Sequence, residues 1–198
     1  MKIKELFITI CVLFISINSI AQELELKNKK SWYVPDYASV QLAGNIGLFS
    51  VGAGYEIFDD VWYAELLYGY APRSITEAES NHLITIKNTF PFFTKELRNS
   101  FSISPIAGIA ITYDAGNNTF TSLPSQFPKG YYISNAIHLT IFGGFKVHKD
   151  FKNDKIFKGI DMYYELGTVE SYLWYAITSS EFSLSDAFSS AIGVNIYF

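Results

Sequence analysis

The sequence predicts an all-β fold, a transmembrane antiparallel up-and-down β-barrel of eight strands, and three observations point to it. Apolar side chains alternate with small or polar ones through much of the chain, aromatic residues make up 17% of it, and turn residues separate segments of roughly ten residues. A tilted strand of about that length crosses the hydrocarbon core of a bilayer. Because closure pairs every backbone group, an apolar outer face can meet lipid without a free edge.

The alternation is clearest at the C-terminal end of the sequence. Ile192, Val194, Ile196 and Phe198 share one parity, and the residues between them are small, polar or tyrosine. Side chains of one parity lie on one face of a strand. We therefore expect this strand to turn an apolar face toward hydrocarbon, because in water that face and an open edge would favour aggregation.

One hairpin can be predicted in register. A tight turn at residues 59–60 would place Ile57 opposite Trp62 on the outer face. Glu56 would then lie opposite Tyr63 on the inner face. The two apolar patterns agree only in this register, since a slip of one residue would move every side chain to the other face.

The same alternation gives eight strands in all. They are expected near residues 37–46, 49–58, 61–70, 82–90, 101–113, 131–147, 160–172 and 187–198. An even number of strands places both termini at one end of a barrel, which in this class is the periplasmic end. The longest connections would lie at the other end, near residues 71–81, 114–130 and 173–186.

The chain divides into three parts by composition. Residues 1–21 have the pattern of a secretory signal peptide, with lysines first, then an apolar stretch and small residues before the cleavage site. Residues 22–36 would form a periplasmic N-terminal segment, and residues 37–198 the barrel. The only cysteine, Cys11, lies in the signal peptide, so the processed chain would contain no thiol for disulfides, metal ligation or catalysis. The formal net charge of −4, without basic blocks, excludes the electrostatic footprint of a nucleic-acid-binding protein.

With these features in place, the chain resembles the small outer-membrane β-barrel proteins of Gram-negative bacteria. The Ser-Ile-Ala-Gln junction at 19–22 and the tyrosine-rich strands resemble those of Bacteroidota. The pattern formed by Ile192, Val194, Ile196 and Phe198 resembles the signal that the barrel-assembly machinery reads. The resemblance implies an integral outer-membrane location, outer-membrane lipid and the assembly machinery as partners, and a monomeric state. It implies no activity, because this architecture serves many functions.

The interior is expected to be filled rather than open. Glu65 and Lys87 would fall nearly opposite each other on adjacent strands and form an ion pair. Eight-stranded barrels have interiors just wide enough to be filled by side chains. The residues expected to fill the lumen are Gln41, Asn45, Glu56, Tyr63, Glu65, Lys87, Asp161 and Glu165.

An enzymatic alternative starts from the segment around Ser134. Tyr132-Ile133-Ser134-Asn135 resembles the His-x-Ser-Asn motif of lipid A deacylases, but a tyrosine stands where the catalytic base belongs. His138 lies four residues from Ser134, or about 13 Å along a strand, which is beyond hydrogen-bond reach. Asp161 and Glu165 would point inward from the next strand, so a site built from these four residues stays open as a candidate.

The sequence therefore favours a non-enzymatic outer-membrane barrel with a filled lumen that acts structurally, or in binding, through its outer loops. The alternative is a lipid A-modifying enzyme, either a deacylase-like esterase or an acyltransferase. We expect no cofactor, and no metal site, because His82, His138 and His148 lack metal-ligand spacing.

Overall fold

The part of the chain that can be described falls into two units. Residues 31–34 belong to the first unit, which ends at Val34, and Pro35–Phe198 form the second. The predicted signal peptide and Ser134 lie outside the described residues. No helix in the described part is long and apolar enough to cross a membrane. The computed structural model describes residues 31–58, 60–76, 80–116, 119–121, 136–152, 156–178 and 184–198.

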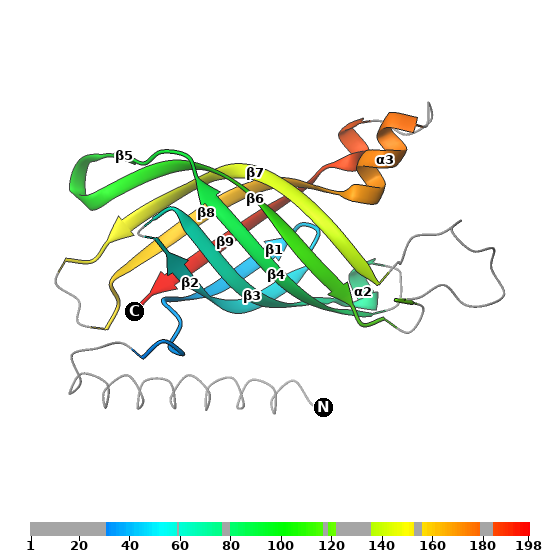
Figure 1. The fold of residues 1–198 in the computed structure, drawn as a ribbon, viewed down its shortest axis with the longest axis horizontal. Helices are drawn as coiled ribbons and strands as arrows, with labels where there is room; N and C mark the ends of the chain where they lie inside the picture. The colour runs from blue at the N-terminus through cyan, green and yellow to red at the C-terminus, as the bar shows by residue number, and fades with distance from the viewer. Residues whose placement is uncertain are drawn as a thin grey trace. The chain divides into compact units, whose positions relative to one another are not determined.

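Eight strands of the second unit form a closed antiparallel barrel with up-and-down connections (Figure 1). Each strand pairs with both neighbours, and the pairings β1–β9 and β4–β6 complete the circle. The predicted barrel of eight strands is thus confirmed. The strands are β1 (Tyr37–Ala43), β2 (Phe49–Ile57), β3 (Trp62–Ala71), β4 (Asn81–Pro91), β6 (Phe101–Asp114), β7 (Ile137–Asp150), β8 (Gly159–Val169) and β9 (Ser189–Tyr197).

Short helices, 3-10 turns and one short strand lie at the two ends of the barrel. We call the end that carries Tyr37 and Tyr197 the termini end, and the opposite end the loop end. A two-residue strand, β5 (Lys95–Glu96), pairs antiparallel with the start of β6 at the termini end and was not predicted. The helices and 3-10 turns are α2 (Arg73–Thr76), η1 (Arg98–Ser100), α3 (Glu170–Thr178) and η2 (Leu184–Ala187).

The predicted hairpin register is confirmed. Ile57 pairs with Trp62, and Glu56 pairs with Tyr63. Phe58 and Asp60 have φ angles of 57° and 65°, in the left-handed region that tight hairpin turns require.

Three of the predicted strands are too long by two residues or more, and one of them, 187–198, begins only at Ser189 because Leu184–Ala187 form η2. The segment 160–172 ends as a strand at Val169, and the residues after it start α3, because the carboxylate of Glu170 accepts the backbone N–H of Leu139 at 2.7 Å and so replaces the next ladder bond. The strand predicted at 37–46 ends at Ala43, where the φ angle of 61° turns the chain out of the sheet. Residues 131–135 of another predicted strand lie outside the described residues.

The early end of β1 lets the β1–β2 connection fold into the barrel. Ile46 from this connection is buried and packs with Leu67, Ala110 and Phe142. The hydroxyl of Ser50 donates to the carbonyl oxygen of Ile46 at 3.0 Å and holds it there. An apolar cluster therefore closes the lumen toward the loop end.

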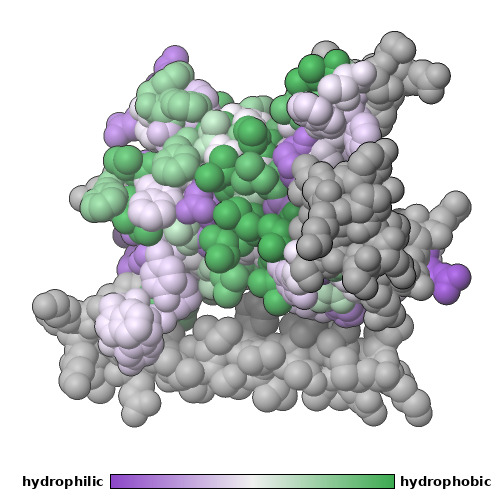
Figure 2. Space-filling model, turned by 45° about the vertical axis from the view of Figure 1, so that its right-hand side comes forward, coloured by the Kyte–Doolittle hydropathy of each residue, from purple (hydrophilic) through white to green (hydrophobic). Residues whose placement is uncertain are grey.

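The outer face of the barrel is apolar all round. Each of the eight barrel strands contributes at least one large aliphatic or thioether side chain that is exposed on the outside, and Figure 2 shows apolar residues gathered on one face of the wall. One example from each strand in chain order is Val40, Val51, Leu66, Ile86, Ile111, Ile141, Met162 and Ile192. We call this exposed set the outer belt.

Two adjacent glycines on β7 give a matched test of interior packing. A Cβ added at Gly144 would lie 1.9 Å from the carbonyl oxygen of Tyr164, whereas one at Gly143 would meet only the Ile106 oxygen at 3.8 Å. We expect Gly144→Ala to destabilise the barrel by about 1–3 kcal/mol, as overpacking does. Urea denaturation of the refolded variants measures this, and Gly143→Ala should cost well under half as much. Equal effects would contradict the packing described here.

Candidate functional site

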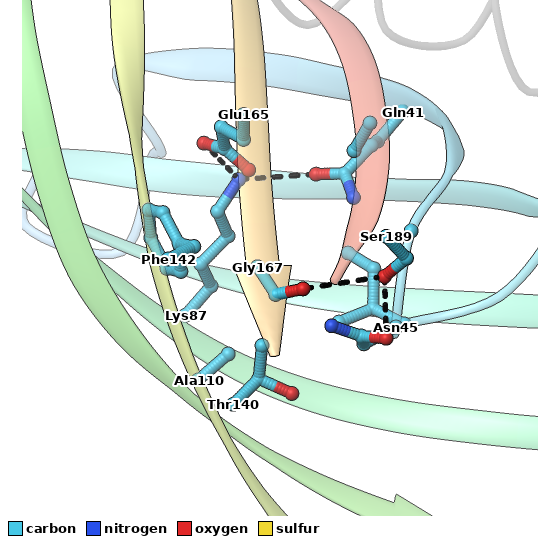
Figure 3. A pocket seen from close by; sticks show the side chains of 12 residues that line it. Gln41, Asn45, Lys87, Ala110, Thr140, Phe142, Glu165, Gly167 and Ser189 are labelled. Atoms are coloured by element: carbon cyan, nitrogen blue, oxygen red, sulfur yellow. Dashed lines mark hydrogen bonds and ion pairs between the residues drawn. The ribbon is translucent and has the colours of Figure 1, made fainter. Parts of the chain in front are cut away.

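The centre of the lumen holds a buried lysine between two buried carboxylates. Lys87 on β4 lies 2.8 Å from Glu165 Oε1 on β8 (Figure 3). It also lies 3.7 Å from Glu65 Oε1 on β3. The Lys87 ammonium also donates to Gln41 Oε1 on β1 at 3.0 Å. All four side chains are buried. One cation is thus bound by groups from three other strands, and Lys87, Glu65, Glu165 and Gln41 form the central cluster.

Aromatic rings complete the surroundings of this lysine. Its ammonium lies 4.5 Å from the ring centroid of Tyr163 and 4.9 Å from that of Phe142. The Tyr163 hydroxyl donates to Gln41 at 3.1 Å. Ring faces attract a desolvated cation, so these contacts offset part of the cost of burying the charge.

The free space beside the central cluster is very small. The cavity there measures about 20 Å³, which is room for about one water molecule. At its loop-end side, the Ser189 hydroxyl donates to Asn45 Oδ1 at 2.6 Å (Figure 3). At this level the lumen has no room for a solute.

A second cluster lies toward the termini end and centres on Asp161, which is fully buried. His148 Nδ1 lies 2.6 Å from Asp161 Oδ1, and the Tyr197 hydroxyl donates to Oδ2 at 2.6 Å. Lys146 Nζ lies 3.8 Å from the same Oδ2. These four residues, from β7, β8 and β9, form the Asp161 cluster.

The Asp161 cluster borders a larger polar cavity of about 290 Å³. His148 Nε2 lies 3.2 Å from Asp150, whose side chain is largely exposed. Lys146 lies 3.8 Å from the ring centroid of Tyr63 and 3.7 Å from Asp60. The walls thus carry both signs of charge, and most of their charged groups already have partners.

Register places Ser102, His148 and Asp161 directly opposite one another on three adjacent strands. Catalytic triads have the same order of nucleophile, base and acid, with the base taking its proton from the hydroxyl. Here His148 Nε2, the nitrogen that would have to accept that proton, is engaged with Asp150. The imidazole acts as a bridge between two carboxylates, which leaves the serine hydroxyl without an activating base.

Among the described candidates, His138 does not lie close to Asp161 and Glu165. Glu65 and Lys87 do approach each other as described above, but His138 lies at the loop end, where its Nδ1 is 3.8 Å from Glu170 Oε1. Asp161 pairs in register with His148, ten positions along β7 from His138, or about 33 Å. Glu165 belongs to the central cluster.

Sequence reasoning missed the role of three residues: Lys146, His148 and Tyr197. The signal was available for all three. Lys146 and His148 share the parity of Thr140 and Phe142, which point inward, and Tyr197 shares the parity of Ala191 and Asn195, which are buried. The prediction considered His148 only as a metal ligand. No three described His, Cys, Asp or Glu side chains are arranged to hold a metal ion.

Fold and site together define a closed eight-stranded antiparallel barrel with a polar, ion-paired lumen. No protein-family model, curated protein or solved structure shows significant similarity to the chain.

Proposed function

We propose that the protein is a non-enzymatic integral barrel of a bacterial outer membrane, exported by its signal peptide and inserted by the barrel-assembly machinery. Its lumen is closed to solutes, and it acts structurally or in binding through the loop end. One observation carries the proposal: large apolar side chains are exposed on the outer face of all eight barrel strands, while Glu65, Lys87 and Glu165 lie buried in the lumen and are paired.

The outer belt supports lipid as the surrounding solvent. Removing a large aliphatic side chain from water contributes about 1.5–3 kcal/mol, and this gain repeats on every strand if hydrocarbon covers the belt. The outward amide of Asn88 accepts a hydrogen bond from Trp62 Nε1 at 2.9 Å. Such a bond is expected where no water can satisfy a polar group.

The central cluster supports a closed lumen. A passing ion or solute would have to displace Lys87 from Glu165 and Glu65 and move the rings of Tyr163 and Phe142. The loop end would then face the exterior, because barrels of this class keep both termini in the periplasm. The long β3–β4, β6–β7 and β8–β9 connections lie at that end.

Planar-bilayer recording tests the closed lumen. We expect the purified barrel, once it shows heat-modifiable migration and floats with lipid vesicles, to give no stable conductance steps. A porin reconstituted in the same way is the control that open lumens are detected. Ion-selective steps from this chain would contradict the proposal.

The enzymatic alternative has a separate test. Mass spectrometry of lipid A from cells with and without the gene should give the same acyl pattern. An altered pattern that disappears in Ser134→Ala or His138→Ala would replace the proposal with a lipid A-modifying activity.

A further inference from the structure

The helix α3 is an apolar element outside the barrel core. None of its side chains is buried, and Tyr172, Trp174, Tyr175 and Ile177 are all exposed. Its only charged residue, Glu170, lies in the first turn. In water, a helix with this composition would expose these aromatic and aliphatic side chains to solvent.

The start of α3 is fixed to the barrel rim. The pairing of β8 with β7 ends at Val169 and Thr140, so the next N–H on β7, that of Leu139, has no strand partner on that side. Glu170 Oε2 accepts this N–H at 2.7 Å. This contact ties the first turn of the helix to the loop end of β7 and β8.

The surface of α3 continues the outer belt. Leu166 on β8, and Ile137 and Leu139 on β7, are exposed outward residues close to the point where the helix begins. Figure 1 shows α3 beyond the loop end of β8 and β9. Whatever covers the belt at this rim is therefore positioned to cover the helix as well.

We propose that α3 is an interfacial anchor that lies in the headgroup region of the bilayer, with Trp174 and its aromatic neighbours at the boundary with the acyl chains. The inference rests on the proposed function, because it needs the barrel in a membrane. Tyrosine and tryptophan favour this boundary, where an apolar ring and a polar tip are both satisfied. Since α3 has no lysine or arginine, it binds through apolar area and not through lipid phosphate.

Single-tryptophan variants test the position of α3. The chain has three tryptophans, so Trp32→Phe with Trp62→Phe leaves only Trp174, and Trp32→Phe with Trp174→Phe leaves only Trp62 on the barrel wall. Both variants are refolded into phosphatidylcholine vesicles whose acyl chains carry bromine either near the headgroup or near the chain end. We expect Trp174 to lose most of its emission with the shallow bromine and less with the deep one, and to emit at shorter wavelength than in urea.

The wall tryptophan separates the two proposals. If brominated lipid quenches Trp62 but not Trp174, the anchor is overturned and the membrane barrel stands. If neither tryptophan is quenched, both proposals fail. Adding phosphatidylglycerol or high salt should leave the quenching of Trp174 unchanged, and quenching that depends on anionic lipid would overturn binding through apolar area.

Discussion

Lys87→Met should lower the free energy of unfolding by about 3–5 kcal/mol, the effect expected when one partner of a buried ion pair is removed. The substitution shortens the side chain by only one heavy atom but leaves the carboxylates of Glu65 and Glu165 buried without their cation. Urea titration of the barrel refolded in phospholipid vesicles, followed by fluorescence, measures the change.

Two controls separate the loss of charge from the loss of volume. Lys152→Met removes an exposed lysine at the termini end and should change stability by less than about 0.5 kcal/mol. The triple variant Lys87→Met, Glu65→Gln and Glu165→Gln removes all three charges, and it should recover much of the stability that Lys87→Met loses. A triple variant no more stable than Lys87→Met alone would show that the unpaired carboxylates are not the cause.

Register could be predicted from the sequence where it depends on adjacent strands. The pairs Ile57–Trp62 and Glu65–Lys87 follow from a turn and from the period of two, and both are directly opposite in the barrel. Contacts across the lumen could not be predicted in this way. Lys87 meets Glu165 because the stagger of the closed barrel brings β4 and β8 to the same level, and stagger is a property of all eight strands together.

The alternation of apolar and polar residues also could not predict where the chain departs from strand geometry. The residues that follow Val169 continue the aromatic pattern of β8 but form α3, because the carboxylate of Glu170 takes the next backbone N–H of β7. The connection after Ala43 inserts Ile46 into the lumen, where the sequence predicted a continuing strand. In both places a single side chain contacts residues that are far away in the sequence. The alternation along one strand cannot predict such long-range contacts.

Asp161→Leu should have the second large effect, because Asp161 accepts bonds from Tyr197 and His148 and lies near Lys146. Leucine has a similar size but leaves the buried hydroxyl and the buried ammonium without this acceptor. We expect a loss of about 3–5 kcal/mol, measured by the same urea titration.

Asp150→Leu is the matched control, because Asp150 bonds to the other nitrogen of the same imidazole but is largely exposed. Water replaces an exposed carboxylate, so this variant should lose less than about 1 kcal/mol. His148→Phe would remove the bridge itself while Asp161 keeps Tyr197 and Lys146, so its cost should lie between those of the two aspartate variants. If Asp150→Leu lowered the free energy of unfolding as much as Asp161→Leu does, burial of the carboxylate would not explain the stability of the Asp161 cluster. The groups that line the adjacent cavity would then contribute more to stability than the buried contacts of Asp161.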